Sequence, residues 1–576
     1  MLKFRTKSAI AVLVGALFCL PVILGLAGII LPAFGYFPAL GHTNFTLDIA
    51  ISFLATPGLA PAIWLSLKTG LLATGLSLIG SFILIVCFFG TALIRYLRNL
   101  MGPLVAIPHS TIAIGMLFLL TPSGWLLRLI SPELSGFERP PAWDLLPDDY
   151  GLGLILGLMA KEVPFLVMLG MAGSATIPVA RLQDITTNLG YGKLAGWVLI
   201  ILPLVYRQLR LPVIAVLIFS ISVVDMALLL APSLPPPLAI LVLNDFNDAD
   251  LASRLPASFG ALLQILLAII GVCIWLILEG LIGSLLQHCQ KLGFRATAAD
   301  KTIPFFVLLA SLPMIIGVFG LVAAFIWSFS ESWFFPAALP SIFSLTHWHA
   351  AVGISSMVLK SAMLAITSSL LATCIILTLL YIDRKNVVGN AITSEVSDLP
   401  KKLLTAALFL PLLIPQISFL FGLQIGLSWA GFDGSWPALL YCHMIFIMPY
   451  AWLILSPAFV ALEWKHDYVA ATLGLGPISR FFRIHLALLA FPIGAALFIG
   501  VSVSIALYLP TVFVGGGRIN TITVEAVSLG ASGGRGPAGV AAMIQILIPL
   551  ICFLVIQASL RLRFGRFSSM RSGGLQ

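Results

Sequence analysis

The feature that most constrains this chain is a series of apolar segments of about 20 residues that recurs along its whole length. An α-helix of that length crosses the hydrocarbon core of a bilayer, where every backbone N–H and C=O must find its partner within the protein. Sixty per cent of the 576 residues are hydrophobic and only nine per cent are charged, whereas a soluble domain has about 25% charged residues. We therefore predict an all-α, polytopic membrane protein.

The distribution of charge predicts how the chain is oriented. With an even number of spans both termini lie on one side, and most of the 31 Lys and Arg fall in the loops on that side. The positive-inside rule then places both termini in the cytoplasm. Topology therefore accounts for the formal charge of +9, and no nucleic-acid partner is needed. The twelve spans on which this rests are 8–32, 63–91, 103–121, 151–171, 202–231, 257–282, 304–328, 353–382, 403–427, 437–460, 489–513 and 537–560.

The chain contains an internal repeat made of three motifs that recur in the same order. SLKTGLLATGLSL matches VLKSAMLAITSSL, VAIPHSTIAIG matches LLIPQISFLFG, and LGYGKLAGWVLIILP matches LGLGPISRFFRIHLA. The repeat predicts two tandem six-helix units related by pseudo-twofold symmetry, residues 1–282 and 304–576, joined by a cytoplasmic linker at 283–303.

The most informative segments are the loops between the fourth and fifth span of each half, at 181–203 and 466–487. Each has a short helix-compatible stretch, then Leu-Gly-x-Gly, then an amphipathic or apolar run that enters the next span. Gly190 and Gly474 would form the turn, because glycine takes a positive φ without penalty. We predict a helix–turn–helix on the membrane surface that sits in a groove of a partner and transmits its movement.

These two loops resemble the EAA loop of the permease subunits of ATP-binding-cassette (ABC) importers. That pattern is Glu-Ala-Ala, three residues, Gly, and a hydrophobic run that ends near Leu-Pro. In the first half Asp184 stands at the Glu position, and Gly190 and Pro203 match the later positions. In the second half Ala470 and Gly474 fit the same frame.

The sequence also departs from the pattern. Tyr468 occupies the second Glu position, with Asp467 one place early, and Ala487 replaces the proline. Ile185 and Thr186 replace the two alanines of the first loop. The alternative is an ordinary pair of surface loops whose glycines only end helices. The residues that we assign to the ATPase-coupling loops are Asp184, Gly190, Gly192, Pro203, Asp467, Ala470, Gly474, Gly476, Arg480 and Arg483.

The resemblance implies a function. The chain would form the translocation pathway of an ABC importer in a bacterial inner membrane. A cytoplasmic ABC ATPase homodimer would bind ATP and Mg²⁺, and an extracytoplasmic solute-binding protein would deliver the cargo. The chain itself would have no catalytic site, cofactor or metal, and it contains no G-x-x-x-x-G-K-[ST] phosphate loop.

The fused architecture narrows the resemblance further. It is similar to the two-unit permeases of ferric-iron and thiamine importers and to the Ynj-type permeases. The strings KEVPF, at 161–165, and SVVDMALLLAPSLPPPLA, at 222–239, look most similar to the Ynj-type group. Thiamine, ferric iron and another small solute all remain open as cargo.

Ionisable groups inside spans cost several kcal/mol, so each one is a functional candidate. Lys161 and Glu162 lie in mid-span, where they either contact cargo or form a packing pair neutralised by neighbouring helices. Asp225 lies near the outer end of span five, where it either contacts cargo or reaches the outer interface. We expect His443 to be a hydrogen-bonded packing residue more than a ligand. The candidate pathway residues are Lys161, Glu162, Pro164, Asp225, His443 and Pro449.

A second function class also has to be considered. A secondary transporter of the 6+6 helix type, driven by H⁺ or Na⁺, would use Glu162 or Asp225 as its ion site. This hypothesis explains the repeat and the buried charges. It does not explain why the two loops match each other.

Overall fold

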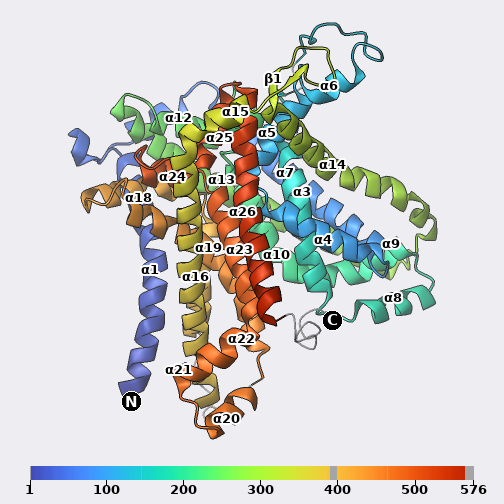
Figure 1. Ribbon diagram of the computed structural model, residues 1–576, viewed down its shortest axis with the longest axis vertical. Coiled ribbons are helices and arrows are strands. Elements are labelled where there is room, and N and C mark those ends of the chain that lie inside the picture. Colours follow the sequence, from blue (N-terminus) through green and yellow to red (C-terminus); the bar gives the residue numbers. More distant parts are fainter. Residues whose placement is uncertain (1, 144–145, 390–398, 464, 565–576) are drawn as a thin grey trace.

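The computed structural model describes residues 2–143, 146–389, 399–463 and 465–564, which are almost entirely helical (Figure 1). The helices up to the middle of the chain are α1 (Leu2–Ala33), α2 (Asp48–Leu54), α3 (Leu59–Phe88), α4 (Leu93–Ala106), α5 (His109–Leu120), α6 (Trp125–Ile130), α7 (Leu152–Ser174), α8 (Val179–Asn188), α9 (Lys193–Gly196), α10 (Leu202–Ser222), α11 (Ala227–Leu230), α12 (Leu238–Phe246) and α13 (Arg254–Lys291).

The remaining elements begin with α14 (Ile303–Ser328) and the short strands β1 (Ser330–Ser332) and β2 (Ile342–Phe343). The helices that follow are α15 (Thr346–Ala350), α16 (Ser355–Gly389), α17 (Leu399–Leu413), α18 (Ile417–Trp429), α19 (Trp436–Val460), α20 (Lys465–Thr472), α21 (Pro477–Arg480), α22 (Leu486–Leu488), α23 (Ala490–Ala506), α24 (Leu509–Gly515), α25 (Ile522–Ala531) and α26 (Arg535–Phe564).

Within these described ranges, 9 helices are long and apolar enough to cross a membrane, and up to 11 if each of two bent pairs counts as one span. One pair, Ala406–Leu413 and Ile417–Trp429, bends by 108°, and the other, Pro477–Leu488 and Ala490–Ala506, by 74°. The stretch Phe18–Ala33 of α1 is a shorter apolar helix. The prediction of an all-α polytopic membrane protein is confirmed, and the number of twelve spans remains a prediction.

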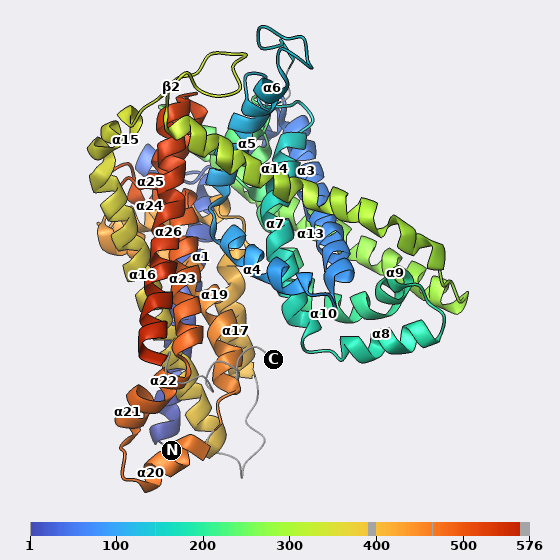
Figure 2. The same cartoon turned by 45° about the vertical axis from the view of Figure 1, so that its right-hand side comes forward.

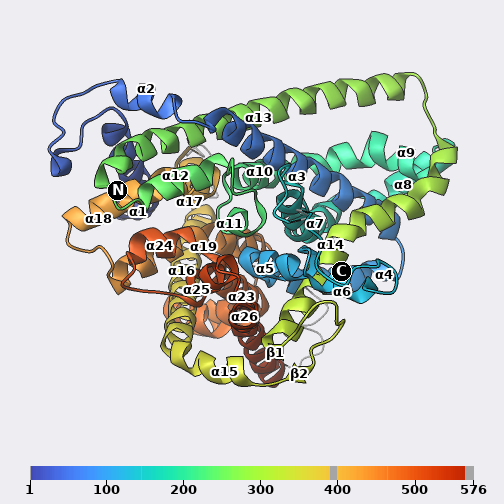
Figure 3. The same ribbon diagram turned by 90° about the horizontal axis from the view of Figure 1, so that it is seen from above.

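The first helix of each half packs on the other half. α1 contacts α17 and α18 as well as α13, and α14 contacts α5, α3 and α26. In Figure 1, α1 accordingly lies on the left, near α18, while α3, α7 and α10 lie on the right. Seen from above, α14 lies beside α5 (Figure 3). The two predicted units therefore interlock, and their boundaries at 282 and 304 remain a prediction.

Glycines make these two crossings possible. A Cβ on Gly422 of α18 would lie 1.9 Å from the carbonyl oxygen of Gly25 in α1. A Cβ on Gly115 of α5 would lie 2.7 Å from the carbonyl carbon of Gly320 in α14. Small residues allow membrane helices to approach this closely. The glycine that ends the repeated motifs VAIPHSTIAIG and LLIPQISFLFG is thus the point where the first helix of the opposite half crosses.

The segment that joins the halves is partly helical. α13 runs past residue 282 and ends at Lys291. A turn follows, then a 3₁₀ segment, Thr297–Thr302, and α14 begins directly afterwards at Ile303. Figure 2 shows α8 and α9 beneath the junction of α13 and α14, so this segment lies close to the first of the two predicted loops.

Candidate functional site

The first predicted coupling loop is a helix–turn–helix. α8 ends at Asn188, and Gly190 has φ +80°. The Gly190 N–H donates to the Thr187 carbonyl at 2.9 Å, and the Tyr191 N–H donates to the Thr186 carbonyl at 3.0 Å. This is the bonding with which a glycine in the left-handed region ends a helix. A π-helical turn, Trp197–Ile201, connects α9 to α10, so Lys193–Ser222 forms one long apolar helix.

The second loop repeats this geometry. Gly474 has φ +82°, and its N–H donates to the Ala471 carbonyl at 3.0 Å. The Leu475 N–H donates to the Ala470 carbonyl at 3.0 Å, as Tyr191 does to Thr186. Gly476 precedes α21, and a π-helical turn, Phe481–His485, again follows. The predicted turn thus occurs at both glycines.

Small side chains lie inside each loop. Ala470 and its counterpart Thr186 are both buried, with 4% of the surface exposed. A Cβ built on Gly196 would lie 2.8 Å from the Thr186 hydroxyl, so the first loop has no room for a side chain at residue 196. Asp184, at the expected Glu position, is exposed, and Pro203 lies half-buried at the start of α10.

The two loops differ in what they expose. In the second loop the large apolar side chains on the surface are Tyr468, Val469, Leu473, Ile478 and Phe482, each more than half exposed. In the first loop the helix after the turn is mostly covered, with Trp197 fully buried and Leu199 at 3% exposure. The entry into the membrane differs as well, because the second loop joins its span at the 74° bend and the first does not.

An ion pair holds the second loop together. The Arg480 Nε lies 3.2 Å from the Asp467 Oδ1, and the His485 Nε2 lies 3.4 Å from the same oxygen. Arg480 also donates through Nη1 to the Leu475 carbonyl at 3.3 Å. The Arg480 guanidinium thus joins α21 to α20, whereas Arg483 is exposed, and the assignment of both residues to the coupling loop remains a prediction.

Two buried charges lie on α7, but they have separate partners. The Lys161 ammonium donates to the carbonyls of Leu104, Val105 and Ile107, where α4 ends. A cation is favourable there because the carbonyls at a helix C-terminus have no partner within the helix. The Glu162 carboxylate instead lies 3.5 Å from the Nε2 of His109 on α5.

His109 is a residue that the sequence prediction missed. It follows Pro108 directly in the repeated motif, and Gln416 stands at the same place in the second half. Its ring packs on Phe219 of α10 at a centroid distance of 4.8 Å. The signal available in the sequence was a histidine next to a proline inside an apolar run. In the structure His109 brings α5, α7 and α10 together.

The fifth span of each half is interrupted near its end. α10 stops at Ser222, Val223 is extended, and α11 begins at Ala227. In the second half Leu507 is extended after α23, before α24 begins. Asp225 lies at the first break and is buried, at 7% exposure. The two alternatives for Asp225, contact with cargo and a carboxylate that reaches the outer interface, both remain predictions.

The other candidate pathway residues have packing environments. The His443 Nδ1 lies 2.8 Å from the Ser504 hydroxyl, and its Nε2 lies 3.3 Å from the Thr511 hydroxyl. This is the hydrogen-bonded packing expected for it. Pro164 and Pro449 are buried within α7 and α19, and each helix continues through its proline.

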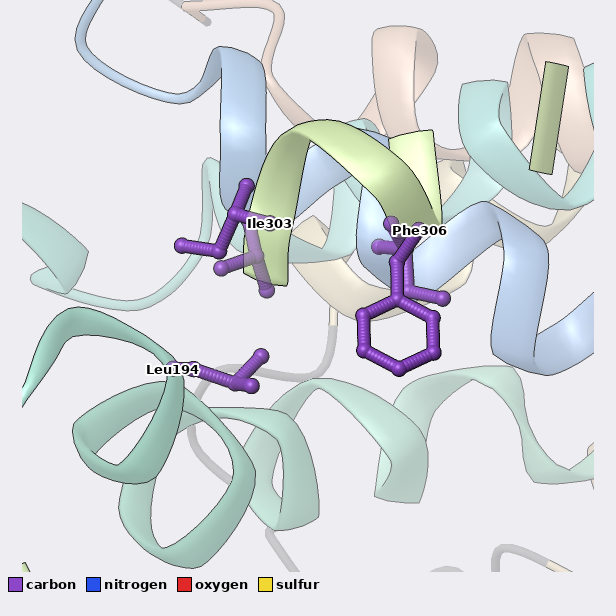
Figure 4. A pocket seen from close by; sticks show the side chains of 5 residues that line it. Leu194, Ile303 and Phe306 are labelled. Carbon is purple, nitrogen blue, oxygen red and sulfur yellow. The ribbon is translucent and has the colours of Figure 1, made fainter. Parts of the chain in front are cut away.

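An apolar cavity of about 190 Å³ lies beside the first loop (Figure 4). Leu194 faces Ile303 and Phe306 of α14 across it, and Ile83 and Val86 of α3 complete the lining. A wall with no polar group offers nothing to a charged or hydrogen-bonding solute. The cavity is therefore a loosely packed joint between α9 and the start of α14.

No family model and no solved structure matches the chain. It is 27% identical over 517 residues, which is 90% of each chain, to the inner membrane ABC transporter permease protein YnjC of Escherichia coli (strain K12). Over nearly its whole length the chain is therefore similar to an ABC transporter permease. The resemblance inferred from the loops and the all-α polytopic fold agree with this relationship.

Proposed function

We propose that this permease forms the translocation pathway of an importer and that the loops around Gly190 and Gly474 couple it to an ATPase dimer. The observation that carries the proposal is the match between the two loops. Both have the same left-handed glycine, the same hydrogen bonds and the same π-helical turn, at equivalent places in the chain. Two like sites on one chain suit a partner that presents two like subunits.

We further propose that the loop end of the molecule faces the cytoplasm in a bacterial inner membrane. α20 and α21 lie at the bottom of Figure 1, the end at which α1 begins. The Lys and Arg residues concentrate in the loops on the side of the termini, which is the cytoplasmic side by the positive-inside rule. An extracytoplasmic binding protein would then deliver a small solute at the opposite end, near α6, α12 and α15.

Continuous helix provides the coupling from the first loop. A helix transmits a push along its axis because each of its turns is bonded to the next. Movement at Gly190 would travel through Lys193–Ser222 to the break that holds Asp225. His109 packs on the same helix through Phe219, and so links it to Glu162. We propose this group of side chains as the part of the pathway that the loop controls.

The proposal is tested by reconstitution in proteoliposomes with the ATPase and the binding protein. We expect ATP hydrolysis to rise when loaded binding protein is added. Gly474→Asp should abolish this rise and the uptake of cargo while the permease remains inserted, because a side chain strains a residue at φ +82°. Normal uptake by Gly474→Asp and by Gly190→Asp would refute the assignment of the loops.

A further inference from the structure

The segment that joins the two halves binds the first coupling loop directly. The Asp300 Oδ2 accepts the Lys193 N–H at 2.8 Å, and its Oδ1 accepts the Leu194 N–H at 2.9 Å. These amides begin the long helix that leaves the loop, and the first amides of a helix have no partner within it. A carboxylate satisfies them and also interacts favourably with the helix dipole.

Backbone contacts reinforce this carboxylate. The Gly192 N–H donates to the Arg295 carbonyl at 3.0 Å. A Cβ on Gly192 would lie 2.9 Å from the Thr297 Cα, so only glycine lets the two segments approach this closely. The side chain of Gln290, near the end of α13, donates to the Leu199 carbonyl. The end of α13 and the joining segment that follows it therefore both pack on the first loop.

Among the described residues, no equivalent segment covers the turn of the second loop, where one contact from outside is the Tyr381 hydroxyl of α16, which donates to the Pro477 carbonyl at 3.4 Å. Apart from chain neighbours, no heavy atom of the described residues lies within 4 Å of a Cβ built on Gly474 or on Gly476. The Arg295 guanidinium, by contrast, lies 3.4 Å from a Cβ built on Gly190. In the second loop the carboxylate that holds the helices is Asp467, which belongs to the loop itself.

We propose that the joining segment Leu292–Thr302 is part of the first ATPase-docking site, with Asp300 as its positioning residue. This inference rests on the function proposed above. One ATPase subunit would then meet the second loop alone, and the other would meet the first loop together with the exposed Arg295. Because α14 begins one residue after this segment, movement of the first loop would also reach the helix that crosses α5.

Loop-selective crosslinking tests the proposal. Leu189 and Leu473 precede the two turn glycines and are 53% and 76% exposed. In a cysteine-free background, Leu189→Cys and Leu473→Cys report contact of each loop with a bifunctional thiol crosslinker on the ATPase. Loss of a capping side chain costs about 1 kcal/mol, so Asp300→Ala should lower crosslinking at residue 189 roughly fivefold. Crosslinking at residue 473 should change less than twofold.

Asp250→Ala is the matched control, because Asp250 caps the 3₁₀ turn just before α13, at the far end of that helix from the joining segment. It should leave both crosslinks unchanged. Equal losses at residues 189 and 473 in Asp300→Ala, or no loss at either, would overturn the proposal while leaving the proposed function intact. If neither cysteine crosslinks to the ATPase in the parent protein, the proposed function itself fails and this inference fails with it.

Discussion

Substitution of Gly422 by alanine tests how the two halves interlock. The new methyl group would lie 1.9 Å from the Gly25 carbonyl oxygen, far inside the 3.4 Å at which ordinary contact begins. The obstacle is backbone on both sides, so α1 and α18 must move apart. Overpacking of this kind costs about 1–3 kcal/mol. We expect a lower Tm for the detergent-purified permease, measured by intrinsic fluorescence during heating.

Gly426→Ala is the control, one helical turn further along α18. No described heavy atom beyond its neighbours comes within 4 Å of a Cβ there, and alanine favours a helix over glycine by about 1 kcal/mol. This variant should therefore be as stable as the parent or slightly more stable. If Gly422→Ala and Gly426→Ala have the same Tm, α1 does not cross α18 at Gly422, and the exchange of first helices is wrong.

Three further predictions concern the loops and α7. Gly474→Ala should reduce cargo-stimulated ATP hydrolysis about fivefold or more, because a non-glycine residue in the left-handed region costs about 1–2 kcal/mol. Gly476→Ala is the control and should change ATP hydrolysis less than twofold, because Gly476 has φ −65°. Equal effects of the two substitutions would exclude the turn as the cause. Arg480→Asp should weaken copurification of the ATPase with the permease. If the ion pair acts within the loop, the additional substitution Asp467→Arg should restore copurification. If it does not, Arg480 acts on the ATPase directly. Lys161→Met should lower the amount of folded permease in the membrane by leaving three carbonyls without their donor, and full expression would show that this contact is dispensable.

Local features of the site were predictable from the sequence. The turns at Gly190 and Gly474 depend only on the conformational freedom of glycine next to a short helix. The apolar segments likewise predicted the polytopic fold, because the bilayer imposes the length and composition of each span. These patterns need no knowledge of what lies on the other side of a helix.

Long-range contacts were not predictable in this way. The repeat motif pointed to Gly115 and Gly422 but not to the helices that cross them, since that depends on the packing of the whole bundle. The sequence likewise could not show that Arg480 faces Asp467 or that Asp300 reaches the first loop. Adjacent charges on α7 suggested a pair, whereas neighbouring residues on a helix point in different directions and bind different groups.

We propose that one chain carries two coupling loops and binds two ATPase subunits. Native mass spectrometry of the complex, purified through a tag on this 61.7 kDa chain, measures that stoichiometry directly. The account predicts one copy of the chain with two copies of the ATPase. A complex with two copies of the chain, or with a single ATPase, would contradict it, because each loop would then not have its own ATPase subunit within one permease.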